Sequence, residues 1–170
     1  MKSLGELGKV AVFIDAANLE LSAKDIGIKI NYRKLRSFFI KRGKLVYIGY
    51  YTAAFDNKGH KEFLNSLKAK GYKVVTKPLK IIKSRDLERG DIRKANFDVE
   101  IAMDAMGLVD QFETLVLFSG DSDFDYLVKN LKKMGKKVYV FSFRGHVSRE
   151  LAKSADLYIP ITRFRDEIAR

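Results

Sequence analysis

The chain has 170 residues, enough for one domain with a sizeable core, and its 46% hydrophobic content indicates a folded protein. It contains no cysteine and two histidines, which excludes disulfide bonds and thiolate metal sites and disfavours a histidine-rich zinc site. A metal bound here would therefore be a hard cation held by oxygen ligands. The formal net charge of +12 favours a polyanionic partner such as nucleic acid, although a lysine-rich surface can also serve solubility alone.

The N-terminal segment lacks the apolar core of a signal peptide, and no apolar stretch approaches the roughly 20 residues of a membrane helix. We therefore expect a soluble, cytoplasmic protein without a membrane partner. Neither an internal repeat nor a low-complexity linker interrupts the chain, so we expect a single domain over residues 1–170. The sequence is compatible with a monomer and with a homodimer.

Apolar runs and helical periodicity alternate along the chain. The run at residues 10–14 is continuously apolar, as expected of a strand buried on both faces. We predict strands, in chain order, at residues 10–14, 44–51, 72–76, 79–82, 114–118, 137–142 and 157–161. We predict helices after Asp15, at 32–41, 58–70 and 95–108, between Phe124 and Gly135, at 148–153 and at the C-terminus. This alternation predicts an α/β fold with a mostly parallel sheet between helices, and such sheets bind ligands at the carboxyl ends of their strands.

The stretch 77–94 differs from the rest of the chain. It holds seven basic residues against three acidic ones. We expect a short strand near its start, followed by a mobile basic loop that tracks a phosphate backbone.

Carboxylates follow two of the predicted strands. Asp15 comes directly after the strand at 10–14, and Asp121 follows the strand at 114–118. If these strands are neighbours, their backbones lie ~4.8 Å apart and the two carboxylates can share one site. Asp123 starts the next helix; standing alone, it would be read as an ordinary helix cap.

Asp98 falls within the apolar arc of the predicted helix at 95–108. A carboxylate there carries a desolvation cost unless a salt bridge or a metal compensates its charge. Asp104 lies at the edge of the same arc and is a second-tier candidate. Asn18 stands one helical turn beyond Asp15, where a neutral amide can hold a metal-bound water or a phosphate oxygen. Because two like charges ~4 Å apart repel by roughly 4 kcal/mol at an effective dielectric near 20, several such carboxylates require a cation such as Mg²⁺ or Mn²⁺.

Other phosphate-binding motifs are absent from the sequence. There is no Gly-x-Gly-x-x-Gly loop, and no Gly-Lys pair is followed by Ser or Thr as a Walker loop requires. Ala17 replaces the second aspartate of the Asp-x-Asp pair of aspartyl-phosphate phosphatases.

Three segments resemble the signature blocks of NYN domains, members of the PIN-like nuclease superfamily that include the LabA-like branch. They are residues 13–19 (FIDAANL), 94–104 (KANFDVEIAMD) and 117–124 (LFSGDSDF), in the family's order. The resemblance implies a three-layer α/β/α PIN-like (Rossmann-like) fold with core strand order 3-2-1-4-5, and Mg²⁺- or Mn²⁺-dependent ribonuclease chemistry. Matched position by position, it implies an acidic catalytic and metal-binding site of Asp15, Asp98, Asp121 and Asp123, with Asn18 as a polar helper and Asp104 at a further recurring acidic position. Ala16 departs from the glycine of many relatives.

The leading hypothesis is a metal-dependent ribonuclease, most simply an endoribonuclease, acting on single-stranded or structured RNA. The basic residues expected to bind RNA are Lys83, Arg85, Arg89, Arg93, Lys94, Arg144 and Arg149. A non-catalytic RNA-binding or regulatory module is the main alternative, and a small-molecule phosphatase or nucleotidase is a third. Tyr50, Tyr51 and Phe143 are candidates for base stacking, but the core interpretation is favoured for each.

Overall fold

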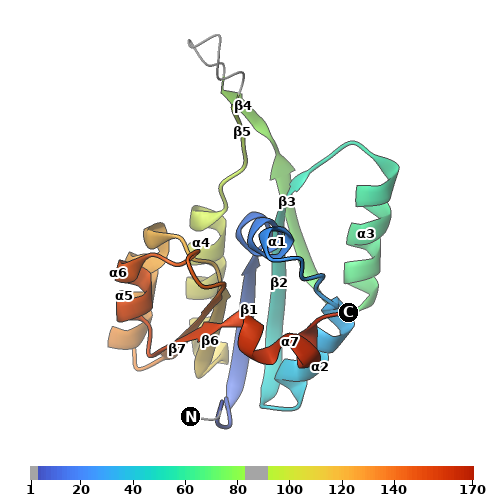
Figure 1. The fold of residues 1–170 in the computed structure, drawn as a ribbon. Coiled ribbons are helices and arrows are strands. Elements are labelled where there is room, and N and C mark those ends of the chain that lie inside the picture. The colour runs from blue at the N-terminus through green and yellow to red at the C-terminus, as the bar shows by residue number, and fades with distance from the viewer. Residues whose placement is uncertain (1–3, 83–91) are drawn as a thin grey trace.

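The computed structural model describes residues 4–82 and 92–170. Within them, six parallel strands form one sheet in the order β3-β2-β1-β6-β7-β8 (Figure 1). Counting only the strands of this sheet, the predicted core order 3-2-1-4-5 is confirmed, and a sixth strand extends it at one edge. The strands are β1 (Lys9–Asp15), β2 (Lys44–Ala54), β3 (Lys73–Pro78), β6 (Thr114–Phe118), β7 (Lys137–Ser142) and β8 (Leu157–Pro160).

The central strand β1 is buried on both faces, as its continuous apolar run predicts. Val10, Val12 and Ile14 belong to one apolar cluster, and Ala11 and Phe13 belong to the other. Each of the five side chains is fully buried. Because successive side chains of a strand point to opposite faces, β1 contributes to both cores of the domain.

Helices cover both faces of the sheet and complete the three-layer α/β/α architecture. One face carries α1 (Ala16–Asp25), α2 (Tyr32–Ile40), α3 (Lys58–Ala69) and α7 (Arg165–Ile168). The other carries α4 (Asp98–Gly107), α5 (Asp125–Lys133) and α6 (Arg149–Ser154). The short 3-10 helices of the described residues are η1 (Val109–Gln111), η2 (Ser122–Phe124) and η3 (Ile161–Phe164).

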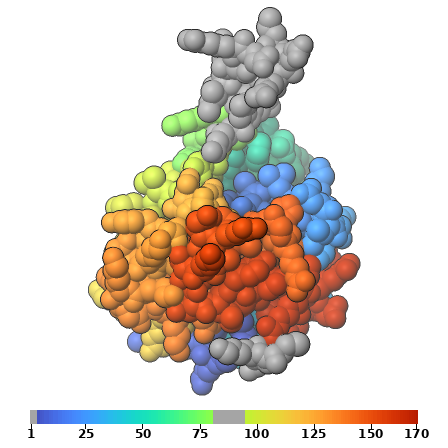
Figure 2. Space-filling view, turned by 60° about the vertical axis from the view of Figure 1, so that its left-hand side comes forward, coloured from blue at the N-terminus to red at the C-terminus, as the bar shows by residue number. Residues whose placement is uncertain are grey.

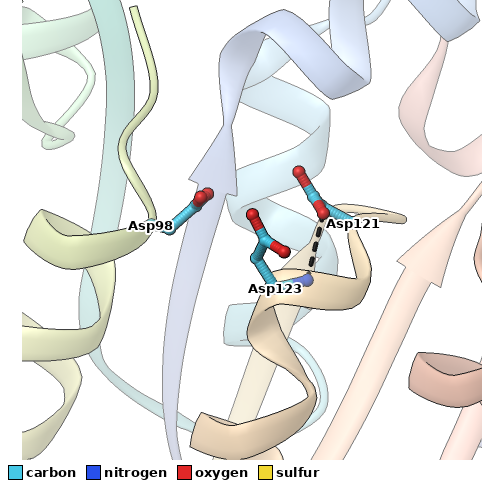
Figure 3. Close-up of side chains that lie close together, drawn as sticks. All are labelled: Asp98, Asp121 and Asp123. Atoms are coloured by element: carbon cyan, nitrogen blue, oxygen red, sulfur yellow. Dashed lines mark hydrogen bonds between the residues drawn. The ribbon is translucent and has the colours of Figure 1, made fainter.

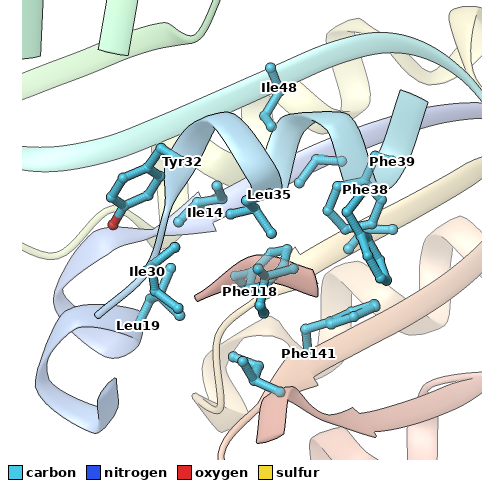
Figure 4. Packing of buried hydrophobic residues seen from close by; sticks show 14 of the residues in the cluster. Ile14, Leu19, Ile30, Tyr32, Leu35, Phe38, Phe39, Ile48, Phe118 and Phe141 are labelled. Carbon is cyan, nitrogen blue, oxygen red and sulfur yellow. The ribbon is translucent and has the colours of Figure 1, made fainter. Parts of the chain in front are cut away.

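The helix α2 packs on the sheet through its apolar side chains. In Figure 4, Leu35, Phe38 and Phe39 of α2 pack against Phe118 and Phe141 of the sheet. In the space-filling view of Figure 2, the C-terminal third of the chain, in orange and red, makes up most of the visible face. Among the described residues, no helix combines the length and the apolarity that crossing a membrane requires.

The strand predicted at 79–82 does not join the main sheet. It is β4 (Lys80–Ile82), which pairs antiparallel with β5 (Ile92–Lys94), a strand that the sequence analysis missed. Strands of three residues carry too little apolar pattern to be recognised. This hairpin projects from the end of the sheet where the strands terminate (Figure 1). The mobile loop expected after residue 82 falls largely on residues 83–91, outside the described residues.

Replacing a buried leucine of α2 tests the packing of the first face. Leu35 is 1% exposed, whereas Leu21 on α1 is 65% exposed. Leu35→Ala should lower the free energy of unfolding by about 2–5 kcal/mol, because it leaves a cavity in the core. Leu21→Ala should change it by less than about 0.5 kcal/mol. Urea unfolding of both variants measures the difference, and equal effects would contradict this packing.

Candidate metal centre

The two strands expected to carry the acid site are neighbours. β1 pairs in parallel with β6, and Ile14 lies opposite Phe118. Asp15 is the last residue of β1, and Asp121 follows β6 by three residues. Both carboxylates therefore lie at the carboxyl edge of the sheet.

Three carboxylates converge at this edge. One oxygen each of Asp98, Asp121 and Asp123 lies within 4.8 Å of the other two. Figure 3 shows Asp98 reaching from α4 toward the pair held by the η2 segment. The backbone N–H of Asp123 donates to Asp121 Oδ1 at 3.0 Å, so Asp121 caps η2 while its carboxylate faces the other two. Helix capping and site formation are thus combined in this residue.

Asp98 lies on the same face of α4 as the buried Ile101 and Ala105, as its helical-wheel position predicts. The helix α4 begins at Asp98, three residues later than predicted, so this side chain lies in its first turn and is half-buried. Burial raises the pKa of the Asp98 carboxyl, and the neighbouring charges of Asp121 and Asp123 raise it further. The Asn96 side-chain amide donates to Asp98 and opposes this rise. Its place in the first turn of α4, on the face of Ile101 and Ala105, directs Asp98 toward the site.

Asp15 lies beside these three side chains without belonging to the group that meets within 4.8 Å. Burial is the main cause that raises its pKa to about 6, and the charges of Asp98 and Asp121 also raise it. Hydrogen bonds from the Asn18 backbone N–H and the Ser119 hydroxyl lower it. Asp15 is therefore electrostatically coupled to the acidic group.

The loop that carries Asp121 is held by contacts that the sequence analysis did not identify. Asn18 Oδ1 accepts from the backbone N–H of Gly120 at 3.0 Å. The buried Ser119 hydroxyl donates to Asp15 Oδ2 at 3.2 Å and accepts from the Asp121 N–H at 3.2 Å. The segment before α6 also contacts this loop, because the Ser148 N–H donates to the Gly120 carbonyl at 2.9 Å. The Ser-Gly pair between an apolar strand and an aspartate was the available signal.

Two further acidic residues of α4 make other contacts. Asp104 Oδ2 accepts from the Tyr51 hydroxyl at 2.7 Å, and the Tyr51 and Tyr47 hydroxyls lie 2.9 Å apart. Glu100 pairs with Lys77 at 2.6 Å. Neither carboxylate belongs to the acidic group of three.

The candidate RNA-binding residues are only partly within the described chain. Lys83, Arg85 and Arg89 lie outside the described residues, while Arg93 and Lys94 belong to the projecting strand β5. Arg144 and Arg149 are exposed in the connection from β7 and at the start of α6.

The aromatic candidates for base stacking are core residues. Tyr50, Tyr51 and Phe143 are each at most 2% exposed, as the favoured interpretation predicts. They therefore present no stacking surface in this structure.

Gly120 tests how tightly the Asp121 loop is held. A Cβ atom there would lie 1.6 Å from the His146 carbonyl oxygen, whereas a Cβ at Gly107 meets nothing within 4 Å. Gly120→Ala should lower the free energy of unfolding by about 1–3 kcal/mol or more, because the backbone at Gly120 must move away from the backbone at His146. Gly107→Ala is the matched control. Urea unfolding that left both variants equally stable would contradict the close approach.

The raised pKa of Asp15 predicts a pH dependence of stability. Without a bound cation, its contribution to the free energy of unfolding should be greatest below pH 3.8 and be lost as the pH rises through about 6. This loss amounts to at most about 3 kcal/mol and should be absent from Asp15→Asn. Urea unfolding in chelator between about pH 4 and pH 8 measures it. Parallel stability curves for the two proteins would contradict the raised pKa.

Comparisons with known proteins agree with this architecture. The family model described as NYN domain matches residues 9–162. The chain is 30% identical over 164 residues to the low amplitude and bright protein LabA of Synechococcus elongatus, covering 95% of this chain and 88% of that protein. A crystal structure of a Vibrio parahaemolyticus protein of unknown function has a TM-score of 0.78 at 24% identity and covers all of both chains, which supports the fold. The chain belongs to the NYN domain family.

Proposed function

We propose that this NYN protein is a metal-dependent ribonuclease that hydrolyses internal phosphodiester bonds of RNA. The observation that carries the proposal is the convergence of Asp98, Asp121 and Asp123 within 4.8 Å at the carboxyl edge of a parallel sheet. That edge is where open α/β sheets bind their ligands. Membership of a family within the PIN-like nucleases supports the same reaction class.

The chemistry of the donor set fits Mg²⁺ or Mn²⁺. All three groups are carboxylates, which are the ligands that hard divalent cations prefer. Among the residues whose side chains the structure describes, none forms an ion pair with these three carboxylates. Negative charge concentrated in this way is suited to a divalent cation. When bound, such an ion lowers the pKa of a coordinated water and stabilises charge developing on phosphate oxygens.

The side chains around this group have distinct roles in the proposal. Asp15 completes the acidic metal-binding set from the β1 side, next to Asp98 and Asp121, whose charges act on it. Asn18 uses Oδ1 to hold the Gly120 N–H, which leaves its NH₂ group to donate to a phosphate oxygen. Asp104, bonded to Tyr51, supports α4 and does not contact the cation.

The positive surface supplies the attraction for RNA. The net charge is +12, and the basic hairpin of β4 and β5 projects from the same end of the sheet as the acidic group (Figure 1). Exposed Arg144 and Arg149 follow β7 near that edge. We infer that these residues, with Lys83, Arg85, Arg89, Arg93 and Lys94, bind the phosphate backbone.

Asp121→Asn tests the reaction, with Asp110→Asn as the control. Asp110 is exposed in η1, before β6 and so at the opposite end of the sheet. Labelled RNA should be cut only with Mg²⁺ or Mn²⁺, and Asp121→Asn should lower the rate at least about 100-fold. Asp110→Asn should cleave the RNA at the rate of the parent protein. Because it is purified in the same way as Asp121→Asn, it also controls for contaminating nuclease. In chelator, Asp121→Asn should be at least as stable as the parent, because one repulsive charge is removed.

Three outcomes would overturn the ribonuclease proposal. Undiminished cutting by Asp121→Asn would place the reaction elsewhere. Intact RNA with tight, salt-sensitive binding would identify a non-catalytic RNA-binding module. Hydrolysis of nucleoside monophosphates faster than any RNA would identify a nucleotidase.

A further inference from the structure

A large cavity opens beside the acidic group. It measures about 1110 Å³ and lies between α1 and α3, over the carboxyl end of β2. Asp15 and Asp121 line one part of it, and Phe55 and His60 line another. The cavity therefore connects directly with the proposed reaction site, and its volume accommodates a nucleotide.

One carboxylate in this cavity is held in a fixed orientation. Glu20 Oε1 accepts hydrogen bonds from the Tyr32 hydroxyl and, at 3.0 Å, from the Tyr50 hydroxyl. Burial raises the pKa of both phenols, so both remain protonated donors. Figure 4 shows the Tyr32 hydroxyl turned away from the labelled apolar side chains. Among the residues whose side chains are described, none donates a hydrogen bond to Glu20 Oε2.

The remaining walls suit an aromatic, anionic ligand. Phe55 is 43% exposed, and its ring packs edge-on against His60 with centroids 4.9 Å apart. The His60 ring is itself fixed, because Nε2 lies 3.0 Å from the Ala53 carbonyl. Exposed Lys24, Lys29 and Arg170 also line the cavity and bring positive charge to it.

We propose that this cavity binds one unpaired base of the RNA substrate and selects bases that carry an exocyclic amino group. The base stacks on Phe55, and its amino group donates to Glu20 Oε2, while the lysines and Arg170 contact backbone phosphates. Uracil is disfavoured because two carbonyl oxygens flank its only ring N–H and would face the carboxylate. This inference rests on RNA being the substrate of the proposed function.

Cytosine and uracil provide the matched test, because at position 4 one carries an amino group and the other a carbonyl. Binding is measured by fluorescence anisotropy with oligocytidylate and oligouridylate of equal length, in chelator so that metal-dependent cleavage does not occur. The parent protein should bind oligocytidylate about tenfold more tightly. Glu20→Gln keeps an oxygen for the tyrosine hydroxyls and presents an NH₂ in place of Oε2, so the preference should reverse.

Two further variants separate stacking and charge from recognition of the base edge. Phe55→Leu should weaken the binding of both oligonucleotides by a similar factor of about five or more. The ratio of the two affinities should therefore stay unchanged. Glu6→Gln removes the same charge from an exposed position outside the cavity and should leave the ratio at the parent value.

The outcomes distinguish this inference from the proposed function. A ratio that Glu20→Gln reverses would support base selection even if no RNA is cleaved. Equal binding of the two oligonucleotides by the parent protein, or an unchanged ratio in a folded Glu20→Gln variant, would overturn base selection while metal-dependent cleavage still stands. Thermal unfolding of Glu20→Gln establishes that the variant is folded.

Discussion

Repulsion between carboxylates that the fold forces together is the constraint on which the site depends. Asp98, Asp121 and Asp123 bring oxygens within 4.8 Å of one another. Two unit charges about 4 Å apart repel by about 4 kcal/mol at an effective dielectric near 20. Burial raises the pKa of Asp15 to about 6, and the charges of Asp98 and Asp121 add to the rise. The surrounding hydrogen bonds of Asn18 and Ser119 hold these groups in place against the repulsion.

The site lies where the strand order changes direction. β1 has β2 on one side and β6 on the other, although β6 comes much later in the chain. The chain leaves β1 into α1 on one face, whereas α4 precedes β6 on the opposite face. Because these helices diverge from the same edge, an opening remains at the carboxyl ends of β1 and β6. Gly120, pressed against the His146 carbonyl, lets the loop after β6 turn back into this opening.

Local patterns in the sequence predict most of the fold but only part of the site. The predicted bounds of β6 and β7 match the structure, because parallel strands buried on both faces are continuous apolar runs. The start of α4 was predicted three residues too early, but Asp98 lies on the predicted face, with the buried Ile101 and Ala105. Ser119 and Gly120 act through residues more than 100 positions away, a separation that periodicity does not encode. The hairpin of β4 and β5 was missed because its strands are short.

The helix α1 links the acidic group to the cavity. Asp15 caps its N-terminus, Asn18 in its first turn holds Gly120, and Glu20 follows within the same short helix. The rise from Asp15 to Glu20 along an α-helix is about 7.5 Å, a distance on the scale of a single nucleotide. A helix does not change its length, so a base bound at Glu20 would fix which phosphate reaches the acidic group. Base recognition and the position of cleavage would then be coupled through a rigid element of the fold.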